Sequence, residues 1–248
     1  MSDAPCPDPR AFPRTRWTLV ITASQEEHAD AEAALETLCR DYWYPLYCYV
    51  RRRGYSAEDS EDLTQSFFQR LLERRDFAIA DAERGRFRSF LLASLKHFLS
   101  DQWDRSQAKK RGGDRTIVSF DQLAAEERFQ AEPSDDQTPE RLFEQNWAQT
   151  LLAHILDKLA LEQREAGKEK LFNVIRPFVA WSTAVDSDYS EAAKALEMKE
   201  NAVRVQVFRI RKRYTEILRQ EIAQTVACAE DVAREMDYLF NTLRGDAA

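Results

Sequence analysis

The sequence predicts an all-α protein with two helical domains, an acidic linker between them and an amphipathic helical tail at the C-terminus. Charged residues make up 32% of the 248-residue chain and hydrophobic residues 44%, a composition typical of amphipathic helices around a substantial core. The chain contains only 6 glycines, and the alternating Val, Ile and Thr runs that indicate strands are nearly absent. Apolar residues instead recur at spacings of three and four, which favours helices.

The predicted organisation follows from shifts in composition along the chain. The start is rich in proline and is expected to form a loose arm, whereas the stretch after the first helices is acidic and contains Pro-Ser-Asp-Asp, which is typical of a linker. We therefore divide the chain into an N-terminal arm (1–28), a first helical domain (29–113), an acidic linker (114–139), a second domain (140–219) and a C-terminal helical extension (220–248).

The first domain is expected to contain three helices. An apolar stripe runs through residues 30–53 and stops at Gly54. Ser56 and Asp59 resemble a capping box, in which the serine oxygen accepts a backbone N–H and the carboxylate reaches back, so a second helix should begin there. A third helix is predicted over residues 87–105.

The second domain is predicted to begin with Thr138 as an N-cap and Pro139 at the first helical position. Further helices are expected at residues 168–182, 189–196 and 200–218. The amphipathic tail that follows, with a break near Cys228, is expected to pack on its own chain rather than on a partner.

The charges are segregated along the chain, although the net charge is −7. Residues 84–111 hold eight Lys and Arg against two Asp, and residues 204–219 hold six against one Glu. Between them, residues 114–144 hold nine acids and three bases. Such separate basic surfaces on an acidic body suit a protein that contacts both DNA and another protein, although either run alone can also be an ordinary solvated helix face.

Residues 188–214 have the layout of a helix-turn-helix. Ala192 and Ala193 are small enough for two helices to cross closely, and Val203 anchors the second helix. Glu197 stands at the turn, where glycine is common because a left-handed conformation is often needed. A bare helical hairpin fits the same pattern. The residues assigned to DNA binding by this motif are Lys199, Asn201, Arg204, Val205, Phe208, Arg209, Arg211, Lys212 and Arg213.

Within this set we expect two kinds of contact, one with base edges and one with phosphates. Val207 and Ile210 continue the buried face, so Asn201, Arg204 and Val205 are positioned to reach base edges in a major groove. The basic residues from Arg209 to Arg213 suit phosphates.

The order of three sequence blocks resembles the extracytoplasmic-function sigma factors of bacterial RNA polymerase, within the sigma-70 superfamily. The blocks are YSEAAKALEMKENAVRVQVFRIRKR at 189–213, the stretch from Tyr44-Pro45-Leu46-Tyr47 through Ser60–Phe68, and Phe87-Arg88-Ser89-Phe90-Leu91 with Asp101. The resemblance says least about residues 1–28 and the tail after Leu218.

This resemblance implies a non-enzymatic factor that carries core RNA polymerase to promoters and melts them with binding energy rather than ATP. Its partners would be promoter DNA, the clamp helices of the largest polymerase subunit and the flap region; an anti-sigma partner is left open. It implies polymerase contacts at Asp59, Asp62, Gln65 and Phe68. The melted promoter element would contact Arg84, Arg86, Arg88, Lys96, Trp103, Arg105, Lys109, Lys110 and Arg111. Trp103 is nonetheless expected mainly in the core, because it continues an apolar stripe, with base stacking as the alternative.

An enzyme is not expected. His28, His97 and His154 lack any metal-ligand or catalytic spacing, and the glycine-rich phosphate and serine-hydrolase motifs are absent, so we predict no cofactor and no metal. Neither a membrane span nor a signal peptide is evident, so a cytoplasmic location is expected, with reduced structural cysteines. Two alternatives remain: a dimeric helix-turn-helix regulator that acts without polymerase, and a helical adaptor whose basic faces meet acidic proteins.

Overall fold

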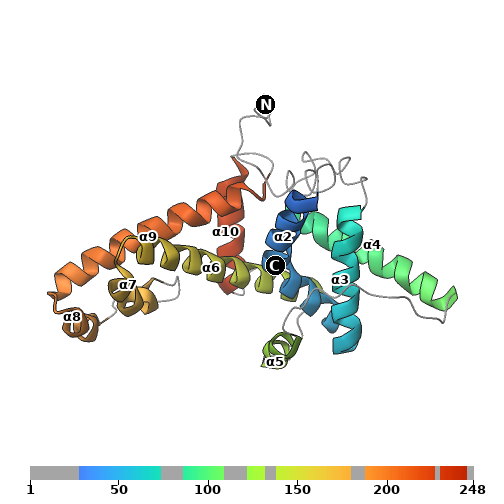
Figure 1. Ribbon diagram of the computed structural model, residues 1–248, viewed down its shortest axis with the longest axis horizontal. Helices are drawn as coiled ribbons and strands as arrows, with labels where there is room; N and C mark the ends of the chain where they lie inside the picture. The colour runs from blue at the N-terminus through green and yellow to red at the C-terminus, as the bar shows by residue number, and fades with distance from the viewer. Residues whose placement is uncertain are drawn as a thin grey trace. The chain divides into compact units, whose positions relative to one another are not determined.

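The computed structural model describes residues 28–73, 86–108, 122–131, 138–179, 188–226 and 230–244. All regular structure in these ranges is helical, so the predicted all-α class is confirmed (Figure 1). None of the described helices has the length and apolar character needed to cross a bilayer. The residues form two compact units: the chain up to Thr150 together with the residues from Ile222 on, and Leu151–Glu221. The division falls inside two helices rather than in the acidic segment 114–139.

The first unit begins with α2 (His28–Arg52), α3 (Ala57–Glu73) and α4 (Phe87–Ala108). Gly54 ends α2 as predicted, with a φ of 93° that is favourable only for glycine. The predicted cap of α3 is also present, because Ser56 Oγ accepts the Asp59 N–H at 3.0 Å. The Asp59 carboxylate accepts from the Ser56 hydroxyl at 2.7 Å.

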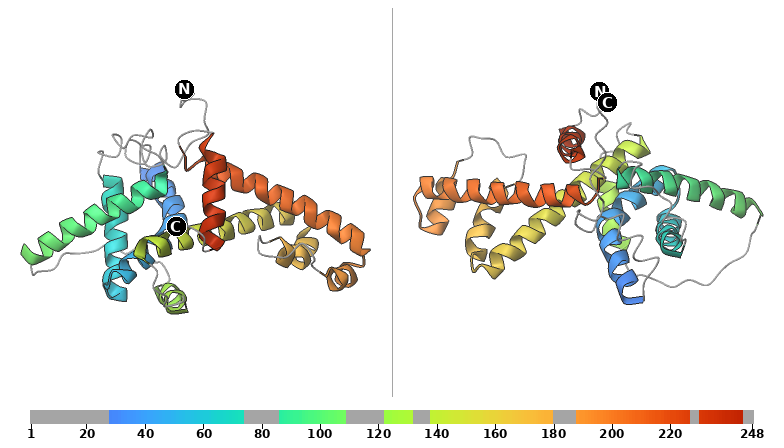
Figure 2. Two further views of the ribbon diagram at one scale, coloured as in Figure 1. Left: turned by 180° about the vertical axis from the view of Figure 1, so that it is seen from behind. Right: turned by 90° about the horizontal axis from the view of Figure 1, so that it is seen from above.

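Helices α3 and α4 cross at a steep angle, as Figure 2 shows in two views. At the crossing the rings of Phe67 and Phe98 lie 5.7 Å apart, and Arg70 Nη2 contacts Asp101 Oδ2 at 2.8 Å. The core of this unit is rich in aromatic side chains, which supply large buried apolar area. Its fully buried side chains include Tyr42, Leu46, Tyr47, Tyr49, Leu71, Phe87, Phe143 and Trp147.

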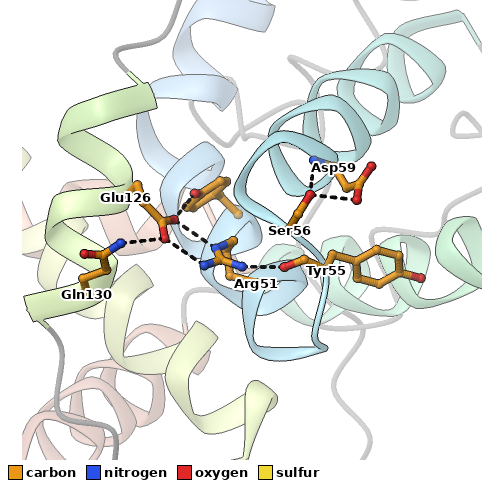
Figure 3. A network of polar contacts seen from close by, with 7 residues as sticks. Arg51, Tyr55, Ser56, Asp59, Glu126 and Gln130 are labelled. Carbon is orange, nitrogen blue, oxygen red and sulfur yellow. Dashed lines mark hydrogen bonds and ion pairs between the residues drawn. The ribbon is translucent and has the colours of Figure 1, made fainter.

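A short helix, α5 (Gln122–Ala131), lies within the segment that the sequence assigns to the linker. It is docked on α2 by one carboxylate (Figure 3). Glu126 accepts hydrogen bonds from Arg51 Nη2 at 2.7 Å, Arg51 Nε at 2.9 Å and the Tyr47 hydroxyl at 2.5 Å. The Arg51 guanidinium holds the pKa of Glu126 at about 2, well below its usual range. A free linker would not make these contacts, so this part of the predicted linker belongs to the first unit.

Helix α6 (Pro139–Glu165) starts as predicted, with the Thr138 hydroxyl accepting the Arg141 N–H at 3.2 Å. Helix α10 (Asp231–Arg244) follows the described turn that ends at Val226. Met236 and Leu239 of α10 are buried in the first unit. The expectation that the tail packs on its own chain is therefore confirmed, whereas Cys228, the predicted break, lies outside the described residues.

In the second unit, α7 (Glu169–Ile175) continues as a 3-10 helix, η4 (Arg176–Phe178). The predicted single helix over 168–182 ends early because Pro177 lacks the N–H that an α-helix interior requires. Helix α8 (Ser190–Leu196) and helix α9 (Glu200–Ala223) complete the unit up to Glu221. Helix α9 runs beyond the predicted end at 218.

Two of the four cysteines lie in described parts of the chain. Cys39 and Cys48 are buried free thiols in α2. Burial raises the pKa of Cys39 to about 12, so it stays a protonated apolar side chain, as expected for a structural thiol. Cys6 and Cys228 lie outside the described residues.

Candidate nucleic-acid interface

The turn between α8 and α9 has the left-handed conformation that the sequence pattern requires. Glu197 ends α8 with φ 53° and ψ 40°, the only positive φ at a non-glycine residue in the described chain. Its N–H donates to the Lys194 carbonyl at 3.2 Å, and the Met198 N–H donates to the Ala193 carbonyl at 2.9 Å. A glutamate therefore does what glycine usually does, at a cost in backbone strain of about 1 kcal/mol.

One face of α9 is buried, as the sequence predicts. Val203, Val207 and Ile210 lie in the core of the second unit, and Tyr214 continues the same face. Ala192 and Ala193 of α8 are buried as well. The small side chains allow α8 to approach α9 closely, which fixes the direction of the opposite face of α9.

The opposite face of α9 carries an exposed aromatic side chain among cations. Phe208 is 69% exposed and Val205 is 48% exposed, one turn apart. The remaining exposed members of the predicted set around them are Lys199, Asn201, Arg204, Arg209 and Lys212. We call these seven residues the α9 surface. An exposed apolar centre with a basic rim can contact a base methyl group and the neighbouring phosphates together.

Arg204 is supported from below by a buried ring. Its guanidinium carbon lies 5.7 Å from the centre of the Tyr189 ring, and Tyr189 in turn lies 4.9 Å from the Phe178 ring. A cation over an aromatic face is held in place without losing its outward donors. Tyr189 was not among the predicted site residues, although its place just before α8 is a usable sequence signal.

Arg211 and Arg213 differ from the prediction, because both make contacts inside the second unit. Arg211 Nε donates to the Phe178 carbonyl at 2.8 Å. Arg213 forms a paired contact with Glu162, with Nη2 to Oε1 at 2.7 Å and Nε to Oε2 at 2.9 Å. Because these side chains hold α9 to its neighbours, we leave them out of the interface.

At the start of α4 the structure corrects one predicted DNA contact, Arg88, and gives a second, Arg86, an acidic partner within the first unit. Arg88 is only 2% exposed and contacts Glu144 and Glu235, so it cannot reach a phosphate. Arg86 is partly exposed, but its Nε lies 2.7 Å from Glu235 Oε2. Sequence reasoning missed this because the acidic partners lie far along the chain.

A groove of about 590 Å³ runs between the α2–α3 turn and α4. Trp103 lines it and is 59% exposed, so the expectation that Trp103 lies in the core is wrong and base stacking remains as the alternative. Lys96 lines the same groove and forms an ion pair with Glu140 at 2.7 Å. Arg53 and Tyr55 also line it and were not among the predicted site residues. The run of basic residues just before Gly54 is the sequence signal that could have identified this part of the groove.

The other predicted contacts to melted DNA cannot be placed. Arg84, Lys109, Lys110 and Arg111 lie outside the described residues, as does the side chain of Arg105.

The four predicted polymerase contacts on α3 differ in how far they are exposed. Asp59 is exposed and belongs to the capping box, while Asp62 and Gln65 are half-buried. Gln65 Nε2 donates to Glu61 Oε1 at 3.3 Å. Phe68 is buried in the core, so it cannot contact a partner directly and is corrected to a structural residue.

Comparisons with known proteins find no matching family model, no matching curated protein and no matching solved structure.

Proposed function

We propose that this chain is a sigma-type transcription initiation factor. In this proposal the first unit binds core RNA polymerase and contacts the melted start-proximal promoter element. The pair α8–α9 acts as a helix-turn-helix that reads the upstream element in double-stranded form. The proposal needs no catalytic group, because binding energy drives promoter opening.

The observation that carries the proposal is the α9 surface. A phenylalanine that is 69% exposed lies outside the core of its own unit, and five polar or basic side chains surround it and Val205. The buried face of α9 and the left-handed turn at Glu197 orient this surface away from the core. This combination favours insertion of α9 into a major groove over an ordinary solvated helix face.

Transcription with purified core RNA polymerase tests the proposal directly. The full chain should allow core polymerase to start at defined sites on fragments of the source genome without ATP hydrolysis for opening. DNA binding without polymerase binding would favour a helix-turn-helix regulator, which the same α9 surface supports. Binding to acidic proteins with no DNA sequence preference would favour an adaptor.

Base reading by α9 is tested by Arg204→Ala. If Arg204 contacts a base edge, the substitution should weaken binding to the selected promoter by about 1–3 kcal/mol and leave binding to unrelated DNA nearly unchanged. Arg164→Ala removes the same charge from an exposed position on α6 and serves as the matched control. Equal losses on both DNAs would reduce Arg204 to a phosphate contact.

The polymerase contact is tested on α3. Asp62→Ala combined with Gln65→Ala should weaken binding to core polymerase and leave upstream-element binding intact, because directed polar contacts supply interface specificity. Glu58→Ala removes an exposed acid from the same helix and is the control. Unchanged polymerase affinity in the double variant would contradict the assignment.

A further inference from the structure

The start of α4 is held by the C-terminal part of the chain. The Phe87 N–H donates to the Thr225 carbonyl at 3.1 Å, which satisfies a backbone donor at the first residue of α4. Glu235 of α10 then contacts two arginines at once: its Oε2 lies 2.7 Å from Arg86 Nε, and its Oε1 contacts Arg88. Residues more than a hundred positions apart therefore meet at the basic beginning of α4.

Aromatic rings complete this contact. The Tyr238 ring, one turn after Glu235 in α10, lies 4.8 Å from the guanidinium carbon of Arg86 and 4.6 Å from that of Arg88. Arg88 also lies 4.5 Å from the Trp147 ring. Helix α10 thus presents a carboxylate and a ring to the same pair of cations, a combination that binds arginine well.

The two arginines differ in how far they are enclosed. Arg88 is 2% exposed and has a second carboxylate partner, Glu144, so it keeps an ion pair whatever α10 does. The Arg86 side chain is 39% exposed, and among the described residues its carboxylate partner is Glu235 alone, which is itself 1% exposed. With two arginines and two glutamates the group is electrically balanced, so little positive charge remains to attract phosphate.

We propose that α10 is an intramolecular competitor of nucleic acid for Arg86, so that the free protein holds the start of α4 closed and departure of α10 opens it. This inference rests on the proposed function, which assigns the start of α4 to the melted promoter element. While α10 is in place the Glu235 carboxylate neutralises the charge of Arg86, so a phosphate binds this guanidinium tightly only after the carboxylate releases it. When α10 leaves, the positive charge of Arg86 is no longer neutralised by Glu235, while Arg88 remains paired with Glu144.

The test compares two isosteric substitutions in α10. Glu235→Gln removes the competing charge, and Asp237→Asn removes an equal charge from an exposed position two residues away. The probe is fluorescein-labelled oligo(dT), with binding followed by anisotropy over a range of salt concentrations. Glu235→Gln should bind roughly fivefold more tightly than Asp237→Asn at low salt, and its salt slope should steepen by about 0.7, as for one added phosphate contact in a single strand. Equal affinities and slopes would overturn the proposal.

Hydrogen exchange on the unmodified protein gives a result that does not depend on how a variant folds. Adding oligo(dT) should speed amide exchange in residues 231–244, because α10 has to leave Arg86. Unchanged or slower exchange there, or no binding of oligo(dT) by any of the proteins, would overturn the competitor role. Transcription with core polymerase distinguishes the competitor role of α10 from the proposed sigma-type function. Transcription can be observed even if the competitor role is wrong, whereas a lack of transcription would contradict the proposed function.

Discussion

The docking of α5 on α2 depends on the charge of Glu126, and Glu126→Gln should undo it. The carboxylate accepts three hydrogen bonds from α2 side chains, two of them from Arg51. Glutamine keeps the shape of the side chain, but it removes the charge and turns an N–H group toward the arginine donors. The expected result is local opening of α5 while the rest of the first unit stays folded.

The magnitude follows from the pKa of Glu126, which Arg51 lowers from 4.5 to about 2. At 1.36 kcal/mol per pH unit this corresponds to about 3 kcal/mol in favour of the folded carboxylate. The side chain is 18% exposed, so solvent screening reduces the effect, and we expect a loss of about 1–3 kcal/mol at neutral pH. Because the folded pKa is depressed, this contribution is fully present above about pH 4.5 and is lost as the pH falls toward 2.

Amide hydrogen exchange measures this opening directly. Exchange in residues 122–131 should become roughly 5- to 150-fold faster in Glu126→Gln at neutral pH. Glu127→Gln removes the same charge from the adjacent exposed position and should leave exchange unchanged. Equal exchange rates in the two variants would refute the view that this ion pair holds α5.

Three further predictions concern the second unit, each checked by urea denaturation. Glu197→Gly should stabilise it by about 1 kcal/mol, because glycine adopts the left-handed turn without strain; no gain would mean that the turn is unstrained. Phe208→Ala should cost less than about 0.5 kcal/mol and Ile210→Ala about 2–4 kcal/mol, since only Ile210 is buried, so equal losses would contradict the exposed position of Phe208. Glu162→Gln should cost less than about 1 kcal/mol at neutral pH, because Arg213 and Glu162 are both more than a third exposed. Arg213 lowers the pKa of Glu162, so this difference from the unmodified protein should shrink on acidification below the ordinary carboxyl range, and a difference that grew would contradict the ion pair.

Local signals in the sequence were sufficient for most of the helices and for several of their ends. The cap at Ser56, the N-cap at Thr138 and the stop at Gly54 depend on residues within a few positions of each other, so they can be read from the chain alone. Pro177 is a further local signal, because its missing N–H ends α7 before the predicted end of that helix.

The α9 surface could also be predicted, because one helix determines it. Once Val203, Val207 and Ile210 face the core, the 3.6-residue period leaves Arg204, Val205 and Phe208 outside. Arg211 and Arg213 are the exceptions, since their partners, the Phe178 carbonyl and the Glu162 carboxylate, lie in separate helices. Helical periodicity predicts which face of the helix a residue lies on, but it does not predict which group from another part of the chain contacts that residue.

The sequence by itself determined the all-helical class, the positions of most helix ends and the exposed face of α9, because each depends on neighbours in the chain. Only the tertiary structure decided that Arg88 is buried, that α5 docks on α2 and that α10 contacts the start of α4. The physical reason is that a charged side chain exposed by its own helix can be neutralised by a carboxylate from any other part of the chain. Glu126 lies 75 residues from Arg51 along the chain, and a local sequence pattern does not predict a contact over that separation.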